Sequence, residues 1–219
     1  MITYSAYIFD LDGTLLDTLG DLAVSVNYAL RTHGMPEHSI DNVRRFVGNG
    51  VRKLMERAIP DGAANPDFEA TFATFRQYYM DHSLDTTMPY KGIPEALAEL
   101  KKRGCRLAVV SNKMMAATQA LCRHFFPDTI EVAIGEDEAH GIRKKPAPDT
   151  VFVSLRQLGA EKQNAVYVGD SDVDIETAAN ASLPCISVLW GFRDRDFLIK
   201  HGAKTLISAP HELLLGHRL

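Results

Sequence analysis

Short apolar segments that end in polar turns constrain the fold of this chain more than any other feature. Residues 6–9, 106–110 and 165–168 are such segments, and helical patterns separate them. Apolar runs of this length indicate buried strands, and strands that alternate with helices favour a parallel sheet with right-handed crossovers. The sequence therefore predicts an α/β fold with a Rossmann-like parallel sheet between two layers of helices.

The same alternation continues along the rest of the chain. Further strands are expected over residues 132–134, 185–189 and, more weakly, 205–207. The expected helices between the strands cover residues 94–103, 114–123, 149–158 and 175–181. Pro94 suits the first turn of its helix, and Gly104 suits the position after its last turn.

One long helical stretch interrupts the alternation directly after the first strand. Helical patterns cover residues 17–33, 42–46, 51–58 and 67–82, and we find no convincing strand between residues 16 and 88. Asp17 or Thr18 can supply the N-cap oxygen of the first helix. Such an insertion would form a separate compact lobe. We therefore expect two domains, residues 1–15 plus 88–219 around the sheet and residues 16–87 as an inserted all-helical domain.

Composition excludes several classes of protein. Lys and Arg number 24 against 28 Asp and Glu, a net charge of −4, which disfavours binding to the nucleic acid backbone. The longest uncharged run, residues 177–192, contains polar residues and does not resemble a membrane span. We expect no signal peptide, and three widely separated cysteines fit a reducing compartment. The expected protein is cytoplasmic, a monomer or a homodimer, without nucleic acid or membrane partners.

Polar residues follow three of the apolar segments. Asp10 and Asp12 follow the first, Ser111 and Asn112 follow the second, and Asp170 follows the third. The carboxyl ends of parallel strands lie on one edge of a sheet, where ligands bind. We therefore expect these side chains to converge, although they are far apart in the sequence.

Three carboxylates at one edge indicate a cation site. Asp10, Asp12 and Asp170 would raise one another's pKa values unless a cation joined them. Oxygen ligands suit Mg²⁺, whereas zinc would call for His or Cys beside the acids. Residues 170–174 carry Asp at alternate positions like a calcium-binding loop, but Ile175 stands where that loop requires glycine.

A magnesium ion beside a free carboxylate favours phosphoryl chemistry. One Asp can attack phosphorus while the other handles protons. Ser111 offers a hydroxyl to the phosphate oxygens, and Gly13, Thr14 and Asn112 offer backbone N–H groups. Residues 144–148 contain two lysines and two prolines, so this stretch can supply a fixed cation.

Four segments resemble the motifs of the haloacid dehalogenase-type phosphatases. They are residues 9–18, 110–113, 144–149 and 168–174, and they occur in the order of that family. Four motifs in order make a specific signature. The resemblance implies a Rossmann-like catalytic core over residues 1–15 plus 88–219.

The resemblance also implies roles for individual residues. Asp10 is expected to be the nucleophile that forms an aspartyl-phosphate, and Asp12 the general acid–base. Ser111 and Lys145 are expected to hold the phosphoryl group. Lys145 is preferred to Lys144 because the family lysine directly precedes the proline.

The metal ligands follow from the same resemblance. Asp10 and Asp170 are expected to bind Mg²⁺, together with the backbone carbonyl of Asp12. Asp174 is expected to orient the metal site or its waters from the outer shell. The presence of Asp12 separates this chain from true dehalogenases, which lack that second aspartate.

The inserted domain matches the helical cap of one subgroup of the family. Within it and directly after it, residues 47–52 and 90–93 resemble the phosphoglycolate phosphatase branch. Asn49, Gly50 and Arg52 are therefore candidate specificity residues, although a plain turn and an exposed helix face explain them too. Residues 41–57 carry a local excess of positive charge that would attract an anionic substrate.

These observations lead to one function and several alternatives. We expect Mg²⁺-dependent hydrolysis of a small phosphorylated metabolite through an aspartyl-phosphate, with 2-phosphoglycolate as the expected substrate. A pyrophosphatase or a sugar-phosphate phosphatase of the same family remains open. The alternative of another class is a non-catalytic phosphate-binding or regulatory protein. Aspartate-phosphorylated receivers, however, have no inserted domain and do not pair Asp12 with the nucleophile.

Overall fold

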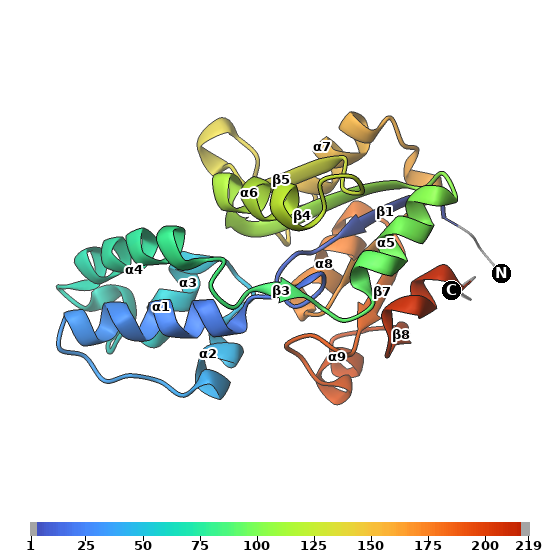
Figure 1. Ribbon diagram of the computed structural model, residues 1–219. Coiled ribbons are helices and arrows are strands. Elements are labelled where there is room, and N and C mark those ends of the chain that lie inside the picture. Colours follow the sequence, from blue (N-terminus) through green and yellow to red (C-terminus); the bar gives the residue numbers. More distant parts are fainter. Residues whose placement is uncertain (1–3, 216–219) are drawn as a thin grey trace. The chain divides into compact units, whose positions relative to one another are not determined.

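The computed structural model describes residues 4–215, which divide into two compact units. Unit 1 contains the chain up to Leu16 and again from Pro89, and unit 2 contains Asp17–Met88. Figure 1 labels helices and strands of both units where there is room. Each unit has buried hydrophobic residues of its own.

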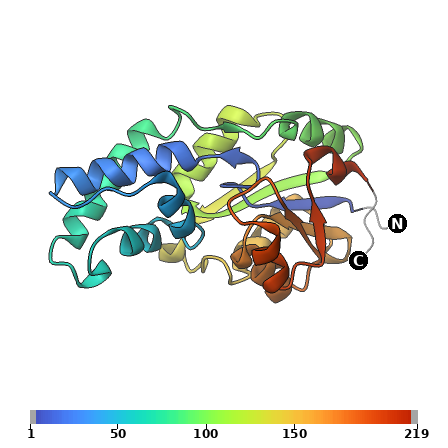
Figure 2. The same ribbon diagram turned by 90° about the horizontal axis from the view of Figure 1, so that it is seen from below.

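Unit 1 is built on a six-stranded parallel sheet with the order β5-β4-β1-β6-β7-β8. Its strands are β1 (Ala6–Phe9), β4 (Arg106–Met114), β5 (Val132–Glu136), β6 (Ala165–Gly169), β7 (Cys185–Val188) and β8 (Thr205–Ile207). Figure 2 shows β1 running beside β4. Phe9, the last residue of β1, is opposite Val109 of β4 and Val168 of β6. The carboxyl ends of these three strands are therefore neighbours.

Different helices cover the two faces of this sheet. Tyr7 and Phe9 share one core with α5 (Ile93–Lys102) and α6 (Met115–Phe125). The alternate residues of β1 pack in a second core with helices on the opposite face. These helices are α7 (Asp149–Leu158) and α8 (Asp172–Ala181). Burial on both faces explains why the strands are continuously apolar, and it confirms the predicted Rossmann-like fold.

The differences from the predicted elements of unit 1 lie mainly at their ends. β4 continues to Met114, so residues 111–113 lie in the strand instead of after it. Its pairing with β5 is irregular between Val110 and Met114, which separates the polar residues from the regular ladder. The prediction lacks the short helical segments η2 (Glu138–His140), η3 (Lys162–Asn164), α9 (Arg195–Lys200) and η4 (Pro210–Leu214).

Unit 2 is helical, as the sequence predicts. Its helices are α1 (Leu19–Thr32), α2 (Ile40–Phe46), α3 (Val51–Ala58), η1 (Gly62–Ala64) and α4 (Phe68–His82). Asp17 lies at the start of α1, and its Oδ1 accepts a hydrogen bond from Leu19 N at 3.3 Å. Two short strands at the linkers, β2 (Leu16–Asp17) and β3 (Met88–Pro89), pair with each other and are not predicted.

A buried carboxylate, Asp21, joins the beginning and the end of unit 2. Its Oδ1 accepts hydrogen bonds from the N–H and hydroxyl of Thr86, and its Oδ2 accepts from the N–H and hydroxyl of Thr87. Asp21 is only 3% exposed. A buried carboxylate is tolerated when its oxygens are satisfied in this way. Asp21 therefore fixes the segment before β3 against the first turn of α1.

We expect Asp21→Asn to lower the free energy of unfolding by about 2 kcal/mol or more, because an amide N–H₂ would replace an acceptor that several donors share. Urea denaturation followed by circular dichroism measures this change. The matched control is Asp41→Asn on the exposed surface of α2, which should change stability by less than about 0.5 kcal/mol. Equal stability of the two variants would contradict the role of Asp21.

Candidate functional site

Three buried carboxylates meet at the carboxyl edge of the unit 1 sheet. Asp10 follows β1, Asp170 follows β6, and Asp174 lies in the first turn of α8. One ligand oxygen from each lies within 4.8 Å of the others. Since β1 and β6 are adjacent strands, their polar ends come together as expected. The structure thus brings Asp10 and Asp170 together and adds Asp174 from the following helix.

Lys145 joins this cluster of carboxylates. Its Nζ lies 2.7 Å from Asp10 Oδ1 and 2.8 Å from Asp174 Oδ1, and its side chain is buried. The neighbouring Lys144 is different, because it is partly exposed and its Nζ lies 3.6 Å from Glu138. Of the two lysines in this segment, Lys145 is therefore the one at the site.

Burial and crowding shift the protonation of these groups. Burial and the charge of Asp174 raise the pKa of Asp10 well above its usual range. The same two causes raise the pKa of Asp170 to about 7. Burial alone would lower the pKa of Lys145, but Asp10 and Asp174 hold it above its ordinary value. When ionised, the three carboxylates and one ammonium carry two net negative charges, which a divalent cation would balance.

Asp174 receives more hydrogen bonds than the other two acids. Its Oδ2 accepts from Asp170 N, from Ser171 N and from the Ser171 hydroxyl at 2.6–3.2 Å. Its Oδ1 accepts from Lys145 Nζ and from the Tyr167 hydroxyl at 3.0 Å. Because both oxygens already accept several hydrogen bonds, Asp174 organises the groups around it.

Asp170 is held by two loops. The Thr14 hydroxyl, after β1, donates to its Oδ1 at 3.0 Å. The Phe192 N–H, after β7, donates to its Oδ2 at 2.7 Å. Trp190 Nε1 donates to the Thr14 carbonyl at 3.0 Å, which joins the two loops to each other. These contacts fix the direction of the Asp170 carboxylate.

The turn after β1 contains two N–H groups that the sequence offers to phosphate. Gly13 N and Thr14 N donate to the carbonyls of Leu16 and Leu11 at 2.9 and 3.3 Å, and their part in phosphate binding stays a prediction. The turn closes on itself through these hydrogen bonds. The Thr14 hydroxyl donates to Asp170, and the absence of a side chain at Gly13 lets the backbone lie close to the Asp170 carboxylate.

The polar end of β4 contributes further contacts. Ser111 is buried, and its hydroxyl accepts a hydrogen bond from Lys113 N at 3.2 Å. The side chain of Asn112 accepts from Lys145 N at 2.7 Å and donates to the Lys145 carbonyl at 3.0 Å. This reciprocal pair fixes the backbone that carries Lys145. The sequence indicated only the backbone N–H of Asn112, so this function of its side chain was missed.

A second buried lysine near the site was not predicted from the sequence. Lys113 Nζ lies 3.0 Å from Asp12 Oδ1. A lysine directly after an apolar run was visible in the sequence, but the same pattern is typical of an exposed strand end. Tyr167 was not predicted either, because a tyrosine inside an apolar strand suggests a buried packing residue without a polar function.

Three glycines allow the backbone to pack against the acids. A Cβ at Gly191 would lie 2.3 Å from Asp170 Cβ, and one at Gly169 would lie 2.3 Å from Asp174 Cγ. A Cβ at Gly13 would lie 2.5 Å from Asp170 Oδ2. No side chain fits at these distances, so each glycine is required by the position of a carboxylate.

Unit 2 contains the candidate specificity residues. Arg52 is paired with Glu69 through two guanidinium nitrogens, and its Cζ lies 4.9 Å from the ring centroid of Phe68. The charge of Arg52 is therefore already matched within unit 2. The assignment of Arg52 to substrate recognition stays a prediction.

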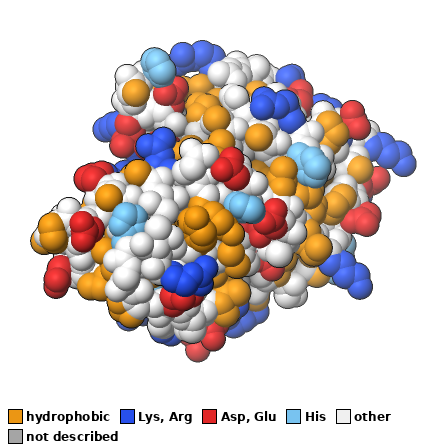
Figure 3. Space-filling model, turned by 60° about the vertical axis from the view of Figure 1, so that its left-hand side comes forward, with side chains coloured by type: hydrophobic (Ala, Val, Ile, Leu, Met, Phe, Trp, Pro, Cys, Tyr) orange, Lys and Arg blue, Asp and Glu red, His pale blue; other side chains and the backbone are white. Residues whose placement is uncertain are grey.

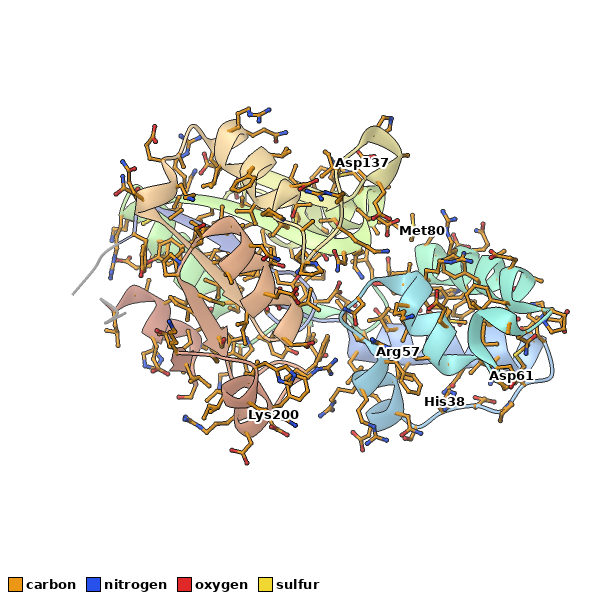
Figure 4. The ribbon with its side chains drawn as sticks, turned by 180° about the vertical axis from the view of Figure 1, so that it is seen from behind. His38, Arg57, Asp61, Met80, Asp137 and Lys200 are labelled. Carbon is orange, nitrogen blue, oxygen red and sulfur yellow. The ribbon has the colours of Figure 1, made fainter. Side chains whose placement is uncertain are left out.

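Another arginine holds the loop that contains Asn49 and Gly50. Arg57, labelled in Figure 4, belongs to α3. Its guanidinium donates to the Phe46 carbonyl at 2.6 Å and to Asn49 Oδ1 at 2.7 Å. Gly50 has a φ of 86° at the N-cap of α3, a conformation that favours glycine. These contacts give residues 46–50 a defined conformation, and their part in specificity stays a prediction.

The surface carries charges of both signs. On the face drawn in Figure 3, Lys and Arg side chains are interspersed with Asp and Glu side chains. Among residues 4–215, no helix combines the length and the apolar character needed to cross a membrane.

The sheet, with three buried carboxylates and a lysine at its carboxyl edge, defines an α/β protein suited to bind a divalent cation there. The sequence model of haloacid dehalogenase-like hydrolases matches residues 7–188. This chain belongs to the haloacid dehalogenase-like hydrolase family, as its four motifs predicted.

Three relatives illustrate the similarity. A phosphoglycolate phosphatase of Aquifex aeolicus is 36% identical over 186 residues, which cover 84% of each chain. An N-acetylmuramic acid 6-phosphate phosphatase of Pseudomonas aeruginosa is 31% identical and covers 95% of this chain and 92% of its own. A crystal structure from Lactobacillus delbrueckii, described as a candidate phosphoglycolate phosphatase, has a TM-score of 0.92, 36% identity and 97% coverage of both chains.

We expect Gly191→Ala to lower kcat/KM for p-nitrophenyl phosphate at least 10-fold, because the new methyl group would displace Asp170, and small displacements of catalytic groups have large effects on rate. Steady-state kinetics of the folded variant measure this loss. Gly202→Ala is the control, since nothing lies within 4 Å of its added Cβ, although its φ of 95° costs some stability. Unchanged activity in Gly191→Ala would show that the close packing against Asp170 is dispensable.

Proposed function

We propose that this chain is a Mg²⁺-dependent phosphomonoester hydrolase that acts on 2-phosphoglycolate. The observation that carries the proposal is the contact of Lys145 with both Asp10 and Asp174 beside Asp170. It combines a buried candidate nucleophile, a fixed cation for phosphate oxygens and a carboxylate pair for a metal. The substrate is supported by relatives named phosphoglycolate phosphatase that cover most of this chain.

The donor set fits Mg²⁺. The cluster is buried, offers oxygen ligands only and, when ionised, carries the net charge that a divalent ion would balance. Asp10 and Asp170 would supply carboxylate oxygens, Asp12 its backbone carbonyl, and Asp174 would act from the outer shell. When bound, the ion would offset the charge of the phosphate and allow an anionic carboxylate to approach it.

In the first step, a carboxylate oxygen of Asp10 attacks phosphorus. The bond from phosphorus to the leaving oxygen breaks, and its electron pair goes to that oxygen, which takes a proton from Asp12. Lys145 and the Ser111 hydroxyl hold the non-bridging oxygens. The alcohol departs as a neutral hydroxyl group, and the phosphoryl group stays on Asp10.

In the second step, water hydrolyses the aspartyl-phosphate. The Asp12 carboxylate, which has given up its proton, takes one from water while the water oxygen attacks phosphorus. The bond from phosphorus to Asp10 breaks, and its electron pair returns to the Asp10 carboxylate. Inorganic phosphate leaves, and both aspartates are restored.

We expect Asp10→Asn to reduce kcat for 2-phosphoglycolate far below one tenth of the wild-type value, because the amide lacks an anionic oxygen for the attack. Phosphate release in the presence of Mg²⁺ measures this change. Asp128→Asn, on an exposed segment of the same unit, is the matched control and should retain full activity. An Asp10→Asn variant with more than about a tenth of wild-type kcat, only ~1.4 kcal/mol in barrier, would remove Asp10 as the nucleophile.

The same assay compares substrates. The proposal requires a higher kcat/KM for 2-phosphoglycolate than for N-acetylmuramic acid 6-phosphate or pyrophosphate. A preference for the sugar phosphate would favour the sugar-phosphate alternative, as one relative's name suggests. A wild-type protein that releases phosphate from none of these substrates would favour a non-catalytic binding protein.

We expect MgCl₂ to raise the melting temperature more at pH 8 than at pH 6. Burial and the charge of Asp174 raise the pKa of Asp170 to about 7 in the folded protein. Between roughly pH 4 and 7, Asp170 therefore keeps its proton in the folded state but loses it in the unfolded state. The contribution of Asp170 to stability therefore falls as pH rises through this window, and Mg²⁺ competes with fewer protons above it.

Differential scanning fluorimetry at constant ionic strength measures both shifts, with NaCl as the salt control. Asp170→Asn should abolish most of the Mg²⁺ effect at pH 8. A shift that is equal at both pH values, or that persists in Asp170→Asn, would place the metal elsewhere.

A further inference from the structure

Two buried lysines form ion pairs with different aspartates near the carboxyl edge of the sheet. Lys145 contacts Asp10 and Asp174, whereas Lys113 Nζ lies 3.0 Å from Asp12 Oδ1. The side chain of Lys113 is 2% exposed and that of Asp12 is 15% exposed. This second ion pair has no part in the mechanism described above.

The backbone of Lys113 is fixed on several sides. Its N–H donates to the Ser111 hydroxyl at 3.2 Å, and its carbonyl lies 3.4 Å from the donating hydroxyl of Thr118. A Cβ at Gly135, on the neighbouring strand β5, would lie 2.7 Å from the same carbonyl. The irregular end of β4 is thus held in place, and it directs Lys113 toward Asp12.

A stability role explains this pair poorly. Removing a lysine from water costs solvation energy, and a well-packed apolar side chain would usually serve stability as well or better. The ion pair of Lys113 with Asp12 instead fixes the position of one carboxylate oxygen, Asp12 Oδ1. An ammonium group at Oδ1 restrains the Asp12 carboxylate and leaves the second oxygen to carry the proton.

We propose that Lys113 is a positioning residue for Asp12, which it holds so that the second carboxylate oxygen delivers its proton to the leaving oxygen. The inference rests on the proposed function, because it assigns a task to the general acid of that reaction. Proton transfer depends on hydrogen-bond distance and direction, so loss of the restraint should slow the steps that need this proton.

The test is Lys113→Met with three substrates: 2-phosphoglycolate, ethyl phosphate and p-nitrophenyl phosphate. The alkoxide oxygens of the first two need a proton to leave, whereas nitrophenolate leaves without one. The ratio kcat/KM reports the reaction only up to departure of the leaving group. We expect kcat/KM to fall at least 10-fold for both alkyl phosphates and less than about 3-fold for the nitrophenyl ester.

Each other pattern overturns the proposal. Equal losses on all three substrates would indicate a structural role, and a loss on 2-phosphoglycolate alone would indicate that Lys113 binds the substrate carboxylate. No loss on any substrate would show that the ion pair is dispensable. If the wild-type protein hydrolyses none of the three substrates, the proposed function itself fails. Failure of the Lys113 proposal is different, because it is seen only when the variant is compared with an active wild-type protein.

Two further variants complete the design. Lys144→Met removes a partly exposed lysine from the same unit and should leave all three kcat/KM values unchanged. Adding Lys113→Met to Asp12→Asn should cause no further loss, because a residue that acts through Asp12 has no effect once the acid is gone. Additive losses would overturn the proposal. Lys113→Gln provides the same comparisons if the methionine variant does not fold.

Discussion

The contact of Lys145 with Asp10 and Asp174 is the interaction on which the rest of the site depends. Without a cation between them, buried carboxylates at one sheet edge would repel one another and bind protons. The fold therefore fixes Lys145 in two ways. Asn112 pairs with its backbone from β4, and the Tyr167 hydroxyl contacts its Nζ at 3.2 Å from β6. The strands on either side of β1, β4 and β6, thus locate the charge that makes the acidic cluster possible.

Much of this arrangement could be predicted from sequence because burial leaves a simple pattern. Strands covered on both faces must be apolar, so the first polar residue after each strand stands out, as Asp10 and Asp170 do. The end of β4 was less predictable, since its irregular pairing keeps polar residues in extended backbone. Gly191 could not be recognised, because its requirement arises from an aspartate 21 positions earlier that only the folded chain brings against it.

In unit 2, the sequence could not show which arginine is available to an anionic substrate, because that depends on how the charged side chains pair in the folded chain. An excess of positive charge over residues 41–57 singles out no particular arginine, because each could face solvent. The fold decides between them through partners elsewhere in the sequence. Arg52 pairs with Glu69 on α4, whereas Arg57 binds the Phe46 carbonyl and Asn49. A local composition can therefore predict attraction to anions, but only tertiary pairing determines which guanidinium group is already neutralised.

The acids of unit 1 show why the proposed catalytic edge needs close packing around its carboxylates. Burial raises the pKa of Asp10, which opposes its use as an anion, while Lys145 acts in the opposite direction. The balance depends on short distances, and close glycine backbones and multiple donors to Asp174 maintain them. A flexible site would let each carboxylate turn to solvent and lose that balance. Preorganised charges act most strongly when water is excluded and nothing must move during the reaction. Burying these groups costs stability, but the proposed mechanism needs that burial because it surrounds the Asp10 carboxylate with fixed charges and excludes water.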